Sequence, residues 1–505
     1  MRRPTRSDQH GLIALVGASI ALRVAYLIDY SQLPFLWGPL FDSRVYLRQA
    51  ASILGGRLDD PASIAFSPLY GWFLAMFGAR PFEQPIHVQL LLGVVNVVLV
   101  HQIGLVLGGR TTGLLAGLAY SAYGLFVFHE TKLMTETVAL TWLLVAMRLW
   151  VSPRFDRGDR IVSIAIGSLL AVAVLTRSSL LPSIPCFVVA AAMPWRGAPT
   201  LDARGRLVRA GLLLVGLLVP LALHGAWSHA RFGLFVPVTL ASSTAARATS
   251  TSDRWTGDLA VLRHEGTRDV SPYDVVREAE RRVAVSRSGG SDASPLAGID
   301  WIGWARGAPR KIVETFADIE TTSEYGFYGE RSEVPVLRAL SLSFGAIALL
   351  ALLGAAWIVR RRGPWALVPW LPLVVGTSLL TTLFHPSSRY RLPMVVPLVL
   401  VAAFGVASTL RLRDVRARIG AMVVVALIVG GFAARSWRYE LRSPALWETR
   451  VAESAVVRGD LDEARRRIAR ARSLAPGDPD VARSIRRITR GMRGATQPPG
   501  GERPE

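Results

Sequence analysis

Long runs of apolar residues, separated by short polar connections, constrain the fold of this sequence more than any other feature. A helix needs about 20 predominantly apolar residues to cross the hydrocarbon core of a bilayer, because each residue adds about 1.5 Å of rise. About eleven runs approach that length, so we predict an all-α polytopic membrane protein. The runs occupy residues 11–28, 86–108, 112–128, 134–151, 161–176, 180–194, 210–228, 336–359, 364–383, 392–410 and 419–434. The two runs within 161–194 also fit one kinked pair around Pro182 and Pro185.

The composition agrees with this prediction and excludes other classes of protein. Of the 505 residues, 51% are hydrophobic and only 19% are charged, yet 58 Lys and Arg against 37 Asp and Glu give a net charge of +21. A disordered chain would have low hydrophobicity, and a disulfide framework needs more than the single Cys186. A soluble nucleic-acid-binding protein would not carry apolar runs of this length, so we expect no nucleic-acid partner.

The arginines set the predicted orientation, because cytoplasmic loops carry an excess of positive charge. Arginine-rich connections alternate with the others along the chain, beginning with Arg2, Arg3 and Arg6, so we place the N-terminus in the cytoplasm. We interpret the first apolar run as a retained helix, since no A-x-A-like cleavage site follows it and Arg23 interrupts its end. The predicted location is the plasma or inner membrane, multi-pass, with the active site on the outer or periplasmic side.

Two outer segments are too long to be plain connections, and a third forms the C-terminal tail. The first two are 29–85 and 229–335, which we expect to roof an outer cavity. The tail is arginine-rich, but long domains translocate largely regardless of charge. One span more or fewer would place it in the cytoplasm.

The tail resembles one tetratricopeptide unit, with a Gly459-Asp460 turn and a helix that ends before Pro476. One such unit cannot bury its own face, so it must pack on the membrane domain or on a protein partner. We divide the chain into a transmembrane domain (1–434), a helical tail (435–494) and a Pro/Gly-rich disordered terminus (495–505).

Acids and bases from separate spans converge on the predicted outer face. Few acids lie near the membrane, so each is informative about function. The acids are Asp29, Asp42, Glu130 and Glu136, and the basic groups are Arg23, Lys132, Arg177, Arg389 and Arg391, with His129 and His385 beside them. These acids and bases together suit a site where a base meets an anionic, membrane-bound substrate.

Several of these residues have two interpretations. Asp42 begins an amphipathic stretch, 42–54, that we expect to lie in the interface plane. It is either a helix N-cap or a general base. Arg177 either extends to the interface or binds a phosphate. Arg389 and Arg391 break the topology rule in a tight outer turn, which indicates that an anion holds them: a substrate phosphate or a lipid headgroup.

A zinc site is not predicted. His129 and Glu130 begin a possible H-E-x-x-H motif, but Leu133 stands where the second histidine is needed. We therefore predict no metal and no cofactor. A divalent cation that bridges Asp42 and a lipid phosphate stays an alternative, since hard cations favour carboxylate and phosphate oxygens.

Four motifs in this order resemble the GT-C type membrane glycosyltransferases, in the family 39-like group that includes protein O-mannosyltransferases and the lipid A aminoarabinose transferase. They cover about residues 10–410. The motifs are Asp42-Ser43-Arg44-Val45-Tyr46-Leu47 with Ala50, then Ser67-Pro68-Leu69-Tyr70, then Met134-Thr135-Glu136 followed by Leu-Thr-Arg177, and Arg389-Tyr390-Arg391-Leu392-Pro393 with Pro397.

The resemblance implies transfer of a sugar from a polyprenyl-phosphate donor to a hydroxyl acceptor, with inversion, on the outer face. It implies Asp42 as general base, with Arg389 and Arg391, and Arg177 or Lys132, on the lipid phosphate. Relatives often have two adjacent acids where this chain has Asp42-Ser43, so Glu130 is our candidate for the second carboxylate. The predicted substrate-pocket residues are Tyr46, Tyr70, His129, His385, Tyr390, Trp301 and Tyr325.

The acceptor is a lipid, a glycan or a protein; no soluble sugar-binding module of the protein mannosyltransferases is visible. Membrane lipids are expected partners, and the tail is a candidate site for a protein partner. The competing functions are a transporter or flippase of a lipid-linked or anionic substrate, an assembly scaffold, and a transferase without activity. Transporters usually place polar residues near the bilayer midplane in repeated halves, whereas this sequence places them at the outer edge.

Overall fold

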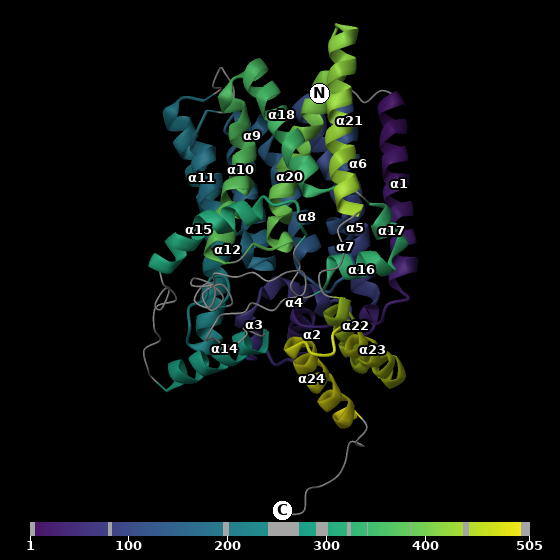
Figure 1. Ribbon diagram of the computed structural model, residues 1–505. Coiled ribbons are helices and arrows are strands. Elements are labelled where there is room, and N and C mark those ends of the chain that lie inside the picture. Colours follow the sequence, from purple (N-terminus) through teal and green to yellow (C-terminus); the bar gives the residue numbers. More distant parts are fainter. Residues whose placement is uncertain are drawn as a thin grey trace, which may run out of the picture.

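The described part of the computed structural model is helical throughout its regular structure, which confirms the all-α prediction. The described residues are 6–78, 83–194, 201–240, 272–288, 301–320, 325–340, 342–384, 386–437 and 444–495. The long helices form a bundle of roughly parallel and antiparallel rods (Figure 1). Their bounds are α1 (Arg6–Tyr30), α5 (Glu83–Gly108), α6 (Arg110–Ala122), α7 (Gly124–Glu130), α8 (Glu136–Trp150), α10 (Arg160–Thr176), α11 (Ser183–Ala192), α12 (Ala203–Phe232), α18 (Phe344–Arg362), α19 (Leu371–Leu383), α20 (Ser388–Leu410) and α21 (Val415–Trp437).

Seven helical segments of the described chain are long and apolar enough to cross a membrane. An eighth is the pair α6 and α7, which meet at a bend of 60°. Each of the eleven predicted runs falls on one of these segments or on the shorter helices α8, α10 and α11. The seven segments are Gln9–Tyr30, Glu83–Gly108, Ala203–Phe232, Pro335–Arg362, Pro364–Leu383, Ser388–Leu410 and Val415–Ala434.

Small residues let the central helices approach closely. A Cβ added at Gly167 of α10 would collide with the backbone carbonyl of Leu213 on α12, and one at Gly354 of α18 would collide with that of Val401 on α20. Such contacts are typical of helix packing in membranes, where van der Waals contact replaces the hydrophobic drive. The apolar window of α20 is 89% buried and that of α21 only 6%, so α20 is the centre of the bundle and α21 its edge.

Shorter helices gather at the end of the bundle away from the start of α1, which we call the outer end (Figure 1). The predicted amphipathic helix is α2, and it buries Val45, Tyr46 and Ala50. The short helices of the outer segments are η1 (Pro34–Leu36), α2 (Asp42–Leu54), α3 (Ala62–Ala65), α4 (Pro68–Ala75), η2 (Ser178–Leu180), α14 (Pro272–Arg287), α15 (Trp301–Thr315), α16 (Phe327–Glu333) and α17 (Pro335–Ala339). The opposite end has α9 (Pro153–Asp156) and η3 (Pro364–Trp370).

The tail folds into α22 (Pro444–Arg458), α23 (Leu461–Leu474) and α24 (Pro479–Ala495). The predicted turn separates α22 from α23: Gly459 has a φ of 89°, and the Asp460 side chain accepts from the N–H of Glu463 at 3.0 Å. The three helices share a small apolar core and lie at the outer end, against η1 and α16 (Figure 1). The domain boundary at 434/435 falls inside α21 and stays a prediction; residues 496–505 lie outside the described ones.

Candidate functional site

Asp42 and Arg389, far apart in sequence, are in direct contact at the outer end of the bundle. Asp42 is the first residue of α2, and Arg389 lies in the first turn of α20. Oδ2 of Asp42 accepts from Nη1 and Nη2 of Arg389 at 3.3 and 3.2 Å. Both side chains keep about a tenth of their surface exposed, 12% and 11%. A carboxylate and a guanidinium therefore meet where an outer ligand can reach them.

Asp42 is not an N-cap. The residue at the cap of α2 is Phe41, and no side chain caps the helix. The Asp42 carboxylate lies instead in the first turn, where the helix dipole favours negative charge. Among the described residues no hydrogen bond reaches Oδ1, so this oxygen is open to another ligand.

Glu136 joins the two arginines of the site. Its Oε1 lies 2.6 Å from Nη1 of Arg177 and 3.0 Å from Nε of Arg389. Arg177 also donates to the hydroxyl of Thr135 at 3.0 Å and to the carbonyl of Arg389 at 3.0 Å. The sequence places Glu136 among the acids of the outer face and in a motif, but we predicted no catalytic or binding role for this residue.

We call Asp42, Glu136, Arg177 and Arg389 the outer cluster. Its formal charges cancel, two carboxylates against two guanidinium groups. A narrow crevice with no room for a water molecule borders it, and Glu136, Arg177 and Pro393 line that crevice with four apolar residues. An added anion would therefore have to displace a carboxylate from an arginine.

His129 is buried beside the outer cluster. It is 3% exposed, and its charge would interact with Glu136, Arg389 and Arg177. Neither ring nitrogen has a hydrogen-bond partner among the described residues. The imidazole is thus a polar group available to a ligand that enters the cluster.

Three other predicted residues lie in separate buried ion pairs. Glu130 is 2.7 Å from Nη2 of Arg23, and Lys132 is 2.6 Å from Glu330. Arg391 is 2.7 Å from Glu320 and donates to the carbonyls of Thr315, Ala317 and Ile319. The structure therefore brings Asp42, Arg177 and Arg389 together but ties Glu130, Lys132 and Arg391 to other partners. Their functional roles stay predictions.

The pair of Lys132 and Glu330 fastens α16 to the bundle. The ammonium lies 4.1 Å from the ring centres of both Tyr30 and Phe128. Burial lowers the pKa of Lys132 to about 8, against the pull of the Glu330 charge. Burial also raises the pKa of Glu330, against the opposing effect of Lys132. A buried pair of this kind acts mainly to specify geometry, since desolvation offsets much of its attraction.

The predicted pocket tyrosines lie around the cluster in different ways. Tyr46 and Tyr70 are buried edge to face, with ring centres 4.8 Å apart. Burial, and then the Asp42 charge, raises the pKa of Tyr46. Tyr390 is half-buried, with its ring centre 5.8 Å from the Arg177 guanidinium and 5.6 Å from that of Arg389.

The remaining predicted pocket residues lie further away or outside the described chain. Tyr325 is buried, and its hydroxyl lies 3.1 Å from the Ser43 hydroxyl. Trp301 is 48% exposed on α15 and touches none of the cluster in any described contact. His385 lies outside the described residues. Within the described chain no three His, Cys, Asp or Glu side chains gather as a metal site, and the prediction about metal stays a prediction.

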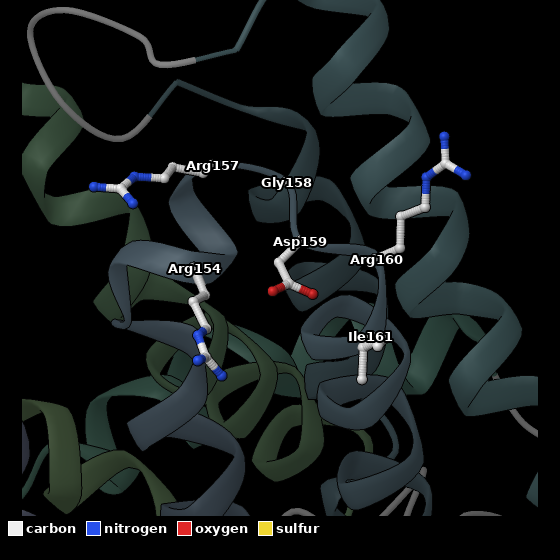
Figure 2. A pocket seen from close by; sticks show the side chains of 6 residues that line it. All are labelled: Arg154, Arg157, Gly158, Asp159, Arg160 and Ile161. Carbon is white, nitrogen blue, oxygen red and sulfur yellow. The ribbon is translucent and has the colours of Figure 1, made fainter.

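A second hollow lies at the opposite end of the bundle, between α9 and α10. Figure 2 shows the Asp159 carboxylate in its middle, with the guanidinium groups of Arg157 and Arg160 turned outward. Asp159 caps α10 by accepting from the N–H of Val162 at 3.2 Å. The exposed arginines match the charge expected of a cytoplasmic loop, so we assign this hollow no catalytic role.

Comparison with known proteins gives matches in structure only. No protein-family model and no curated protein matches the sequence. The apo form of the Archaeoglobus fulgidus oligosaccharyltransferase is 12% identical and covers 93% of this chain and 60% of its own, with a TM-score of 0.50. The same oligosaccharyltransferase tethered to an acceptor peptide is 12% identical (90% and 58% covered, TM-score 0.47). An archaeal oligosaccharyltransferase from Archaeoglobus fulgidus with an inhibitory peptide and a dolichol-phosphate is 11% identical (90% and 60% covered, TM-score 0.46).

This chain spans about three fifths of the length of the solved structures that it matches. At this identity the likeness concerns the fold, and the narrower family 39-like resemblance stays a prediction. The multi-pass helical bundle, with the outer cluster at one end, therefore shares its all-α fold with this solved membrane oligosaccharyltransferase.

Proposed function

We propose that this protein is an integral-membrane glycosyltransferase. It moves a sugar from a polyprenyl-phosphate donor to a hydroxyl acceptor at the outer face of the plasma or inner membrane, with inversion. The acceptor is a lipid, a glycan or a protein. The likeness in fold to an oligosaccharyltransferase supports the general class. The donor and the roles of the residues rest on the chemistry of the outer cluster.

The contact between Asp42 and Arg389 carries this proposal. Transfer from a lipid phosphate to a hydroxyl needs a base on the acceptor side and a cation on the leaving group. These two groups lie 3.2 Å apart at the end of the bundle, within reach of one substrate. Arg177 supplies a second cation through the shared Glu136.

In the proposed step the acceptor oxygen forms a bond to the anomeric carbon while the bond from that carbon to the phosphate oxygen breaks. The electron pair leaves with the polyprenyl phosphate, whose growing negative charge Arg389 and Arg177 stabilise. Asp42 takes the proton of the acceptor hydroxyl. Attack opposite the leaving phosphate inverts the configuration.

The charge balance of the outer cluster supports an ordered binding event. Asp42 and Glu136 neutralise the two arginines through ion pairs. A phosphate that binds Arg389 competes with Asp42 for the same guanidinium. Donor binding would thereby release the carboxylate of Asp42 to act as a base.

The test is transfer of radiolabelled sugar from a polyprenyl-phosphate donor pool in membranes. We expect Asp42→Asn, at matched expression, to lose activity by a factor of about 10²–10⁴ while donor binding is retained. Asp59→Asn, which removes an exposed carboxylate from the same outer loop, is the matched control and should transfer normally. Undiminished transfer by Asp42→Asn would move the search for the base to Glu136 and Glu130.

A transporter or flippase of a lipid-linked or anionic substrate is the alternative. The same arginines would then bind the substrate without any chemistry. Wild-type protein that moves a labelled polyprenyl-phosphate sugar between leaflets, but transfers it to no acceptor, would favour this alternative over the transferase.

A further inference from the structure

We propose that the first helix of the tail, α22, positions Asp42, and that Arg450 is the positioning residue. The catalytic consequence rests on the proposed function. The contact itself is between the tail and the turn that precedes α2, and it can be measured without an activity.

The turn before α2 has an uncommon backbone. The N–H of Ser43 donates to the carbonyl of Leu40 at 3.2 Å, and Phe41 between them has φ 50° and ψ −124°. These angles are those of the first central position of a type II′ turn, which glycine usually occupies. Among the described residues Phe41 is the only non-glycine with a positive φ. Such a conformation persists only where the surroundings hold it in place.

Two elements from distant parts of the chain hold this turn. On one side the Tyr325 hydroxyl accepts from the N–H of Leu40 at 2.9 Å and lies 3.1 Å from the hydroxyl of Ser43. On the other side the Arg450 guanidinium lies 4.3 Å from the centre of the Phe41 ring. Arg450 is 6% exposed, and a desolvated cation over an aromatic face is attracted to it.

Further contacts fix α22 on residues 35–38, the segment just before the turn. Ser454 donates its hydroxyl to the carbonyl of Gly38 at 2.7 Å. A Cβ at Gly38 would collide with the backbone of Ser454, so the approach depends on a glycine. The Trp447 ring packs 5.3 Å from that of Phe35. Helix α22 is thus held against residues 35–38, which directly precede the turn at Phe41.

The tail is also seated on α16, the helix that Lys132 holds. Trp447 donates from Nε1 to Glu333 at 2.6 Å, and Arg467 lies 3.0 Å from the same carboxylate. A side chain at Gly329 would collide with the Trp447 ring. Because α16 is anchored to the bundle, α22 is held between two fixed supports.

The residue after Phe41 is Asp42, so the turn sets the direction of the proposed base. Without Arg450 the ring of Phe41 loses its partner, and the backbone can relax to a negative φ. That rotation would carry the Asp42 carboxylate away from Arg389. Since a displacement of about 1 Å at a reacting group lowers the rate by about 10², the tail would control the turnover rate without touching substrate.

Full-length protein with Arg450→Ala, Arg450→Lys and Arg465→Ala tests this proposal. Arg465 is an exposed tail arginine whose one ion pair within the described chain is with Asp462, so its removal is the matched control. We expect Arg450→Ala to lower kcat at least tenfold with KM for the donor unchanged. Arg450→Lys keeps the positive charge and should lower kcat by a smaller factor. Hydrogen exchange of residues 38–46 should accelerate in Arg450→Ala and stay unchanged in Arg465→Ala.

A Phe41→Gly background separates positioning from general stability. Glycine adopts the positive φ without a clamp, so Arg450→Ala should change kcat less than twofold there. Equal losses in both backgrounds, or wild-type kcat and exchange in Arg450→Ala, would overturn the proposal. If the wild type transfers no sugar, the proposed function fails, and the exchange measurement still decides whether α22 holds the turn.

Discussion

At the scale of single residues, Arg389 and Arg391 illustrate how two similar side chains acquire different environments. They are two positions apart on α20, and two residues turn an α-helix by about 200°. Arg389 therefore faces Asp42, whereas Arg391 faces Glu320 and a row of backbone carbonyls. The same alternation explains why only Arg389 remains partly exposed.

This difference predicts opposite outcomes for two matched variants. We expect Arg389→Ala to keep its thermal stability and lose transfer by a factor of about 10²–10³, the usual cost of one preorganised charge-stabilising group. Arg391→Ala leaves Glu320 buried without its partner, so we expect a loss of about 3–5 kcal/mol in stability. Thermal unfolding in detergent and the transfer assay distinguish them. A stable Arg391→Ala that fails only in transfer would give Arg391 the donor-binding role that the sequence predicted.

At the scale of helices, the approach of α5 to α7 depends on a missing side chain. A Cβ at Gly93 of α5 would collide with the carboxylate of Glu130 on α7. That carboxylate is paired with Arg23, so one glycine permits an ion pair between α7 and α1. Helix contact and ion pair are therefore coupled.

We expect Gly93→Ala to destabilise the protein by about 1–3 kcal/mol, as overpacking does in well-packed cores. Gly211→Ala on α12 is the control, because nothing lies within 4 Å of its added Cβ. It should be neutral or slightly stabilising, since alanine is the better helix former. Thermal unfolding of Gly93→Ala and Gly211→Ala at one detergent concentration compares their stabilities. Equal stability of the two variants would show that α5 can shift to accommodate the added methyl group.

The connection between α2 and α3 is held by Asp60, which predicts a pH dependence. Burial by itself would raise the pKa of Asp60. The hydrogen bonds from Ser52, Ala62 and Arg48 have the larger combined effect, so the pKa lies below its ordinary value. A carboxyl whose pKa is depressed by folding stabilises the folded state above its ordinary pKa and loses that contribution as the pH falls through the folded value.

The difference in Tm between wild type and Asp60→Asn should therefore be greatest near pH 7, begin to shrink near the ordinary aspartate pKa of about 4, and vanish only as the pH falls through the lower pKa of the folded carboxyl. Thermal unfolding at a series of pH values measures it. A difference that stays constant into acid would mean that the charge of Asp60 contributes nothing.

At the scale of the whole molecule, the tail helices lie at one end of the bundle and α9 at the other (Figure 1); Leu201, just before α12, lies beside Gly158 at the end of α9. The orientation predicted from arginines then places the tail outside. With Cys186→Ala as background, Ser473→Cys on the tail should react with an impermeant thiol reagent added to intact cells. Ala203→Cys at the start of α12 should react only after the membrane is opened. The reverse pattern would invert the topology and with it the location of the proposed site.

The predicted spans could be read from the sequence because apolar length is a local property. All eleven runs fall on helices, and the amphipathic stretch 42–54 is α2. The convergence of Asp42, Arg177 and Arg389 followed from topology, since alternating spans bring alternate loops to the same face. Of the two interpretations of Asp42, the helix N-cap was wrong, because the cap position falls on Phe41, whose backbone angles are not visible in the sequence.

The sequence by itself determined that this chain is a helical membrane protein and which face collects its charges. The length of an apolar run and the arginine content of a loop are properties of a single segment, so they can be recognised without knowing which other segments it contacts. Only the tertiary structure decided which charges meet. Glu130, Lys132 and Arg391 are as close to the outer face in sequence as Arg389, but each buried charge takes the partner that its helix face presents. That choice depends on helix rotation and packing across the whole bundle, which no single segment encodes.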